Sequence, residues 1–272
     1  MQAPAPRRGR PSRPIQFAAP AGALARRDLA LVRSVSGILF IISAPSGSGK
    51  TTLTNELLKL VPGLEFSISY TTRPPRGSEQ HGRDYFFVSE EEFQAMTARG
   101  EFLEYACVFG QYYGTAKRFL EDARKTGRDL VLDIDVQGAA QVKKKMPEAV
   151  SIFILPPSRE VLEFRLRHRS HAEHMDSEEV IRRRLEGARK EIENYRNYDY
   201  ILVNDRLEPS IALLKAIVAA ERLKGSAEDL SAEDAGVLAA AEQCLLPNTG
   251  QRAEQILASF ATAGRGQEEK VQ

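Results

Sequence analysis

A loop of small residues lies between an apolar, β-branched segment and a run of helix-forming residues. Residues 38–43 are typical of a buried strand, and a helix is expected from Lys50 onward. Gly47 and Gly49 let backbone N–H groups approach phosphate oxygens, while Lys50 can reach the β- and γ-phosphates. The hydroxyl of Thr51 can bind Mg²⁺. The stretch therefore predicts a nucleoside triphosphate site made of Ala44, Pro45, Ser46, Gly47, Ser48, Gly49, Lys50, Thr51 and Thr52.

A second group of anion-binding residues follows the phosphate loop. Arg73 and Arg76 lie on one proline-stiffened segment, and Tyr85 and Tyr113 can add phenolic donors from neighbouring strands. This set suits a phosphate monoester better than a duplex backbone, and a second phosphate site beside a triphosphate site implies a kinase acceptor. A solvated loop with two exposed arginines and two core tyrosines explains the same residues equally well.

Three carboxylates lie beside strongly apolar strand residues. Guanine presents donors at N1 and N2, where adenine has an acceptor at N1, so an ionised carboxylate such as Glu104 or Asp135 would select guanine. Asp133, at the end of a strand, is suited to holding Mg²⁺ through water. The simpler alternative for Glu104 is a surface carboxylate on an edge strand.

Two charged helices are expected over residues 158–169 and 178–195, separated by a loop that contains His171 and His174. Most of their arginines are expected on solvated faces, but a few should fold over the triphosphate, because phosphoryl transfer requires positive charge near the transferred group. The histidines have no suitably spaced partners for a metal site. The arginines concerned are Arg165, Arg169, Arg182, Arg183 and Arg184.

Composition limits the class of protein. The 272 residues are 42% hydrophobic, enough for a substantial core, and no apolar run is long enough to cross a bilayer. A net charge of +1 gives no general argument for a nucleic-acid or membrane partner. The two cysteines, Cys107 and Cys244, are far apart, which fits a reducing compartment, and a cytoplasmic location is expected.

The two ends of the chain differ from its middle. Residues 1–35 are rich in Pro, Ala and Arg, and we expect a disordered extension or an upstream start codon rather than a transit peptide, because five prolines by Pro20 would break an amphipathic helix. After Lys224, residues 224–272 predict a partly helical extension, either an added helix pair or a loose appendage. Residues 247–250 are expected to separate a last short amphipathic piece.

Between the ends, strands and helices alternate in a pattern typical of an α/β fold. A small, mostly β subdomain is expected early in this part, and a parallel sheet with helices on both faces should form the rest, with ligands at the carboxyl ends of its strands. The segments expected as strands, after the first at 38–43, are 66–70, 84–88, 102–106, 111–115, 130–135, 150–155 and 200–203.

Taken together and in order, these motifs closely resemble those of the guanylate kinase family over roughly residues 37–223. The matching stretches are 44–50, 69–76, 82–87, 102–105, 112–115, 132–138 and 203–205. The resemblance implies an enzyme that transfers the γ-phosphoryl group of Mg-ATP to GMP, giving GDP and ADP in purine nucleotide metabolism. It also implies a P-loop core, a GMP-binding subdomain over 66–116, a helical lid over 158–196 and a family domain over 36–223.

The resemblance also assigns roles to single residues. Asp133 would serve Mg²⁺, together with Thr51, and the acceptor pocket, while Asn204 would lie near adenine. The guanine contacts would be Ser69, Glu104, Thr115 and Asp135. The GMP phosphate would be bound by Arg73, Arg76, Tyr85 and Tyr113. The lid arginines would be Arg169 and Arg184, so that the catalytic set is Lys50, Arg76, Arg169 and Arg184.

Three departures from the family pattern concern Gly77-Ser78 before Glu79, Ser170 in place of a common glycine, and a longer loop at His171. Two other functions fit the same build: a P-loop kinase acting on a ribose bisphosphate, and a non-catalytic scaffold domain that binds peptides. Glu104 with both loop arginines argues against the first, and the intact triphosphate motif argues against the second. Whether the chain is a monomer or a homo-oligomer stays open.

Overall fold

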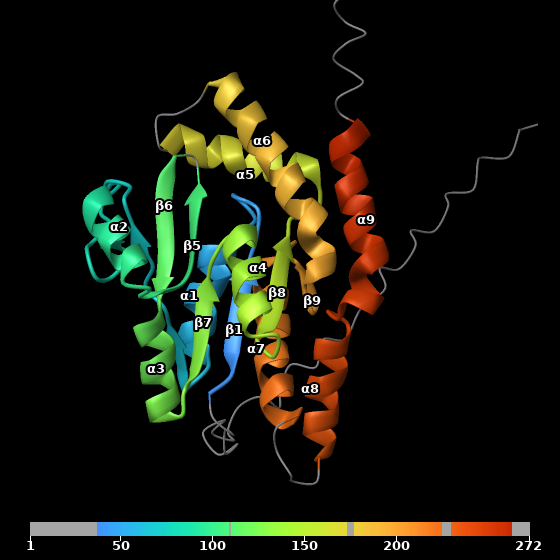
Figure 1. The fold of residues 1–272 in the computed structure, drawn as a ribbon. Coiled ribbons are helices and arrows are strands. Elements are labelled where there is room, and N and C mark those ends of the chain that lie inside the picture. Colours follow the sequence, from blue (N-terminus) through green and yellow to red (C-terminus); the bar gives the residue numbers. More distant parts are fainter. Residues whose placement is uncertain (1–36, 109, 173–176, 225–229, 263–272) are drawn as a thin grey trace, which may run out of the picture.

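A parallel sheet of five strands lies at the centre of the computed structural model, which describes residues 37–108, 110–172, 177–224 and 230–262 (Figure 1). All neighbouring strands in this sheet are parallel, so the predicted α/β class is confirmed. The loops that follow the strands therefore all lie at the carboxyl ends of the strands, on one side of the sheet. The extension expected over 1–35 lies outside the described residues. In spatial order the strands are β2 (Leu64–Phe66), β7 (Asp129–Asp133), β1 (Leu39–Ser43), β8 (Val150–Leu155) and β9 (Tyr200–Val203).

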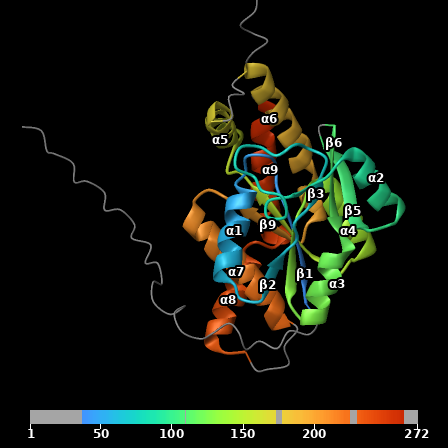
Figure 2. The ribbon, with the colours of Figure 1, turned by 90° about the vertical axis from the view of Figure 1, so that its left-hand side faces the viewer.

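Helices cover both faces of the sheet, as predicted (Figure 2). One face packs against α1 (Lys50–Leu60) and α7 (Leu207–Lys224), and the other against α4 (Val136–Lys145) and α6 (Glu178–Ile192). Alternate residues of β1 contribute to the two cores, and every β1 residue is buried. Burial on both sides explains why the β1 sequence is an uninterrupted apolar run.

A second, smaller sheet is present where a small, mostly β subdomain was predicted. Its helix α2 (Glu90–Ala98) begins at Ser89, whose hydroxyl accepts a hydrogen bond from the Glu92 backbone at 3.1 Å. Phe93 and Met96 of this helix pack on Phe102 beneath the sheet. In spatial order the strands are β4 (Phe86–Phe87), β3 (Tyr70–Thr71), β6 (Gln111–Ala116) and β5 (Phe102–Val108).

Several expected strand boundaries were wrong; for example, the strand expected over 84–88 covers only Phe86–Phe87. The strand expected over 66–70 is divided, because Phe66 pairs in register with Val131 of the large sheet and the small sheet takes over only at Tyr70. The strand expected to end at Asp135 ends at Asp133 instead. Asp135 caps α4 by accepting a hydrogen bond from the Gly138 backbone at 2.8 Å, which requires it to leave the strand. Helix α3 (Lys117–Thr126) was not predicted.

The helix expected over 158–169 lies beyond the carboxyl ends of the strands, and the helix expected over 178–195 begins there and runs down over one face of the sheet (Figure 1). They are α5 (Arg159–Ala172) and α6, and α6 continues into a 3₁₀ helix, η2 (Glu193–Asn197). Leu162 and Leu166 of α5 and Leu185 of α6 are buried in the same core as the sheet. Both helices are therefore packed on the sheet at their buried faces.

The C-terminal segment forms two further helices, α8 (Ala232–Glu242) and α9 (Leu246–Thr262). The link between them runs antiparallel beside β9: the Ile201 backbone donates to Cys244 O at 2.7 Å, and the Leu246 backbone donates to Asp199 O at 3.1 Å. The break expected at 247–250 was wrong, because these residues lie in the first turns of α9, where proline is tolerated. The segment covers the edge of the parallel sheet.

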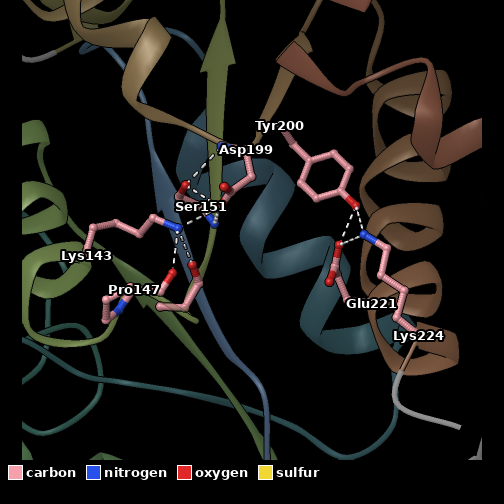
Figure 3. A network of polar contacts seen from close by, with 8 residues as sticks. Lys143, Pro147, Ser151, Asp199, Tyr200, Glu221 and Lys224 are labelled. Carbon is pink, nitrogen blue, oxygen red and sulfur yellow. Dashed lines mark hydrogen bonds and ion pairs between the residues drawn. The ribbon is translucent and has the colours of Figure 1, made fainter. Parts of the chain in front are cut away.

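Two polar networks hold β9 to its neighbours (Figure 3). Asp199 accepts hydrogen bonds from the backbone and hydroxyl of Ser151, at 2.8 and 2.7 Å, and from Lys143 at 3.0 Å. On the other side, the hydroxyl of Tyr200 lies between Glu221 and Lys224 of α7. Within the described parts of the chain, no helix has the length and hydrophobicity needed to cross a membrane.

Candidate active site

The phosphate loop begins after β1 and ends where α1 begins. Gly47 and Gly49 both have φ of 89°, a left-handed conformation that favours glycine, and the Ser48 backbone donates to Pro45 O at 3.1 Å. A Cβ on Gly49 would lie 2.4 Å from Nδ2 of Asn204, so a side chain is also excluded there by contact. The backbone N–H groups at the start of α1 are therefore available to an anion.

Lys50 is positioned by the strand beside the loop. Its ammonium group forms an ion pair with Asp133 and donates to Ile134 O at 3.3 Å. Burial alone would lower the pKa of Lys50, but the attraction of Asp133 outweighs it and leaves the pKa above its usual value. The lysine is therefore charged at neutral pH and lies close to where a triphosphate would bind.

Two oxygen-bearing side chains expected to serve a magnesium ion lie next to Lys50 in space or in sequence. Asp133 ends β7 and Thr51 lies exposed in the first turn of α1, and a hydroxyl and a carboxylate are ligand types that Mg²⁺ prefers. No cluster of three or more acidic, histidine or cysteine side chains that could hold a metal occurs among the described residues. This donor set fits Mg²⁺ bound by one or two side chains and completed by phosphate oxygens and water.

Arg73 is buried in the subdomain formed by the small sheet, with only 6% of its surface exposed. It forms a bidentate ion pair with Glu79, at 2.9 and 3.0 Å, which raises the pKa of Arg73 against the effect of burial. Glu79 also accepts a hydrogen bond from the Arg76 backbone at 2.8 Å. It therefore links the side chain of Arg73 to the backbone at Arg76 and stabilises the loop over residues 73–79. Sequence analysis missed this role, although the six-residue spacing of Arg73 and Glu79 on a turn-rich loop was a usable signal.

Tyr85 and Tyr113 lie beside Arg73, as their proposed common role requires. The Arg73 guanidinium is 5.2 Å from the ring centre of Tyr85 and within hydrogen-bond reach of the Tyr113 hydroxyl. The two tyrosine rings are 6.1 Å apart. The Arg76 side chain, by contrast, is exposed. The alternative in which both arginines are solvated is therefore wrong for Arg73.

Glu104 is also buried, with 3% of its surface exposed, so the interpretation as a surface carboxylate was wrong. Burial raises the pKa of Glu104 to about 7; Thr115, paired with it across β5 and β6, lowers the value, and Asp135 raises it. A Cβ on Gly138 would lie 2.4 Å from Oε2 of Glu104. The glycine therefore allows the carboxylate to approach the first turn of α4.

The remaining residues expected around guanine lie on adjoining elements. Asp135 caps α4, and Thr115 is fully buried on β6 with no hydrogen bond of good geometry to its hydroxyl among the described residues. Ser69 precedes β3, and its carbonyl accepts from the Phe86 backbone at 2.9 Å. The structure thus brings Glu104, Thr115 and Asp135 together.

Asn204 contacts the phosphate loop directly. Its side-chain amide donates to Ser48 O at 2.8 Å, and only 6% of its surface is exposed. Arg165 of α5 donates to Asn204 O at 3.0 Å. Asn204 therefore supports the loop, in addition to any contact with a nucleotide base.

The two expected lid arginines lie on different helices. Arg184 is half-buried on α6, and Arg169 lies on α5, but the Arg169 side chain is outside the described part. Helix α5 reaches the phosphate loop, because a Cβ on Gly47 would lie 2.9 Å from Leu166. The loop that separates the two helices lies largely outside the described residues, and so does its His174.

Together, the fold and this site define a class: P-loop phosphotransferases with a separate subdomain for a phosphorylated acceptor. The sequence model of the family described as guanylate kinase matches residues 36–221. The chain therefore belongs to the guanylate kinase family. It is an enzyme of the kinase class, and its family membership implies ATP and GMP as substrates.

Individual relatives agree with the family match. A protein of Koribacter versatilis named guanylate kinase is 61% identical over 229 residues, which cover 84% of this chain and 98% of that protein. The guanylate kinase of Escherichia coli K12 is 50% identical over 192 residues, or 70% and 91% of the two chains. The crystal structure of guanylate kinase from Anaplasma phagocytophilum matches with a TM-score of 0.59 and 37% identity, covering 71% and 89%.

Proposed function

We propose that this protein transfers the γ-phosphoryl group of Mg-ATP to GMP, with ATP on the phosphate loop and GMP in the small subdomain. The position of Tyr85 supports this arrangement most directly. Its phenol is close enough to Lys50 and Asp133 on one side, and to Arg73 and Tyr113 on the other, for all four to influence its pKa, which burial raises. The two anion-binding groups are therefore neighbours, as transfer between two bound phosphates requires.

The reaction needs positioning and charge neutralisation more than it needs a general base. In this proposal the phosphate loop and Lys50 hold the triphosphate, and Arg73, Arg76, Tyr85 and Tyr113 orient the GMP phosphate. Arg169 and Arg184 supply positive charge where it is needed in the transition state. Thr51 and Asp133 would hold Mg²⁺, which would supply positive charge to neutralise the phosphate groups.

Recognition of guanine would fall to Glu104, Asp135, Thr115 and Ser69. Two carboxylates near one another suit the adjacent N1–H and N2–H₂ donors of guanine. The Thr115 hydroxyl, which has no hydrogen bond of good geometry among the described residues, offers one more polar contact. We place the reaction in the cytoplasm and in purine nucleotide metabolism, and we propose 36–223 as the catalytic domain. The strand boundary at Phe66 argues that the acceptor subdomain begins near residue 67.

A coupled assay tests the proposal. Purified protein with saturating Mg-ATP is given GMP, AMP or ribose bisphosphate, and formation of ADP is followed. We expect rapid turnover with GMP, slow turnover with AMP and none with the sugar phosphate. Absence of GDP under these conditions would contradict the proposal, and turnover only with ribose bisphosphate would replace it.

A further inference from the structure

Helix α4 lies beside the outer edge of the small sheet (Figure 2). Among the described strands, β5 pairs only with β6, so the backbone N–H and C=O groups on its other side are not used by the sheet. Leu103 of β5 is buried in the same core as Ala139 and Val142 of α4. The helix therefore packs against β5 where this strand has no neighbouring strand.

Two side chains of α4 bond to the backbone at this edge. Gln141 uses both ends of its amide: Nε2 donates to Tyr105 O at 2.7 Å, and Oε1 accepts from the Tyr105 backbone N–H at 3.3 Å. Lys145, four residues later, donates to Leu103 O. Backbone groups of residues two apart point to the same side of a strand, so these are the groups that a further strand would pair. Side chains of α4 thus take the place of a neighbouring strand.

Glu104 lies between the two bonded residues of β5. Its own partner on the other side is Thr115 of β6, but the register of β5 against β6 shifts between Phe102 and Glu104. A shift of this kind interrupts regular pairing and bends the strand locally. Pairing with β6 therefore does not by itself fix the backbone immediately before Glu104, and the bond from Lys145 to Leu103 lies at that point.

The face of α4 that bonds to β5 also approaches the Glu104 carboxylate. Gly138, Gln141 and Lys145 are three and four residues apart, which places them on one side of the helix. A Cβ on Gly138 would lie 2.4 Å from Oε2 of Glu104 and 3.4 Å from Oδ1 of Asp135. Asp135 itself caps the first turn of α4. One helix therefore positions both carboxylates, Asp135 through its cap and Glu104 through the backbone on either side.

We propose that Gln141 and Lys145 are positioning residues for guanine recognition: they hold the β5 backbone on both sides of Glu104 and so set the position of its carboxylate. The inference rests on the role proposed above for Glu104. The carboxylate must meet donors at the edge of the base, and hydrogen bonds weaken steeply as their geometry departs from the optimum. Loss of the α4 contacts should therefore weaken guanine binding, whereas loss of a purely structural contact would affect GMP and AMP alike.

The variant Gln141→Met tests the first contact. Methionine has a similar length and helix propensity but lacks the amide donor and acceptor. Values of kcat and KM are measured with ATP and either GMP or AMP as acceptor. We expect kcat/KM for GMP to fall about five- to twentyfold, mainly through a higher KM, while kcat/KM for AMP and KM for ATP change by less than about twofold. Equal losses with GMP and AMP, or no loss with GMP, would overturn the proposal.

A double-mutant cycle shows whether Gln141 acts through Glu104. It compares the wild type with Gln141→Met, Glu104→Gln and the double variant, each with GMP. If the amide acts by positioning the carboxylate, the double variant should have a kcat/KM within about twofold of that of Glu104→Gln alone. If the two losses multiply, Gln141 acts independently of Glu104 and the proposal fails.

The variant Lys145→Met tests the second contact independently of the first. It removes the bond to Leu103 O and should lower kcat/KM for GMP about three- to tenfold, with less than about twofold change for AMP. An unchanged kcat/KM for GMP would overturn the proposal. If Gln141→Met does not fold, Lys145→Met takes its place in the cycle, with the same expected and contradicting results.

Matched controls come from the same subdomain and the same helix. Gln94 is exposed on α2 and donates to Glu90 at 3.2 Å. Lys144 is exposed on α4, next to Lys145. Gln94→Met and Lys144→Met should leave kcat/KM for GMP and for AMP unchanged. A loss with GMP equal to that of the test variants would show a general response to the exchanged side chain and would overturn the proposal.

The same measurements separate this inference from its basis. A wild type that forms no GDP would refute the proposed function. A Glu104→Gln variant with an unchanged ratio of GMP to AMP activity would refute the role of Glu104 and this inference with it. A lowered ratio in Glu104→Gln, together with wild-type behaviour of Gln141→Met, would refute the positioning role alone.

Discussion

Lys50 at the start of α1 and Asp133 at the end of β7 form an ion pair beside the phosphate loop. The pair links the residue expected to bind the triphosphate with the residue expected to serve Mg²⁺. In the absence of nucleotide and metal, the two opposite charges stabilise each other. We expect ATP to compete with Asp133 for the ammonium group when it binds, which releases the carboxylate for the metal.

The first prediction concerns Lys50. Lys50→Ala removes a charge from the triphosphate and leaves Asp133 unpaired, so kcat should fall by about 10²- to 10³-fold with both GMP and AMP. Steady-state rates with each acceptor measure the loss. Lys59→Ala, on the same helix and with a largely exposed side chain, should have no effect. An equal loss in both variants would show that α1 is simply destabilised.

The second prediction concerns Arg184. Its charge is needed mainly in the transition state, so Arg184→Ala should lower kcat by about 10³-fold or more with little change in KM for GMP. Single-turnover and steady-state kinetics measure the effects on kcat and on KM separately. A large rise in KM with an unchanged kcat would instead assign Arg184 to ground-state binding.

The third prediction concerns the choice of base. Glu104→Gln keeps the shape of the side chain but sets an NH₂ donor against a guanine donor, so kcat/KM for GMP should fall about ten- to a hundredfold. The kcat/KM for AMP should fall little, so the ratio of kcat/KM for GMP to that for AMP should decrease. Glu121→Gln on the exposed face of α3 is the control. An unchanged ratio of GMP to AMP activity would place guanine recognition elsewhere.

The fourth prediction concerns pH. With its pKa raised to about 7, Glu104 in the free enzyme is mostly protonated at pH 6 and mostly ionised at pH 8. If the ionised form binds guanine, GMP binding favours loss of that proton, and Kd for GMP should fall as pH rises through 7. Titration calorimetry in buffers of different ionisation enthalpy measures the released proton. Glu104→Gln should abolish this dependence; a pH dependence that survives the substitution would come from another group.

The fifth prediction concerns the C-terminal helices. Ile256 of α9 is 1% exposed in the core that also contains the lid helices, so Ile256→Ala should lower the free energy of unfolding by about 2–4 kcal/mol. Urea unfolding measures the change, and Gln255→Ala, on the exposed face, is the control. Equal stability of the wild type and Ile256→Ala would show that α9 contributes little to the fold.

Sequence alone was sufficient where neighbouring residues decide the outcome. The phosphate loop follows from a buried strand, two glycines and a helix start within 16 residues, and the strands over 150–155 and 200–203 have the predicted bounds. These features depend on local backbone preferences and on the period of apolar residues. The ordered motifs also identified the family, because their succession along the chain needs no knowledge of contacts.

Only the tertiary structure decided which side chains are buried and which groups pair. From sequence, Glu104 could be interpreted either as a surface carboxylate or as a guanine ligand. Its burial depends on the packing of α4, which is distant in the sequence. The contact of Asn204 with Ser48 joins residues 156 positions apart, and the ion pair of Arg222 with Asp129 joins the last turn of α7 to the start of β7. Such pairings arise when separate elements pack around one core, and a local sequence pattern does not specify which distant partner each side chain will meet.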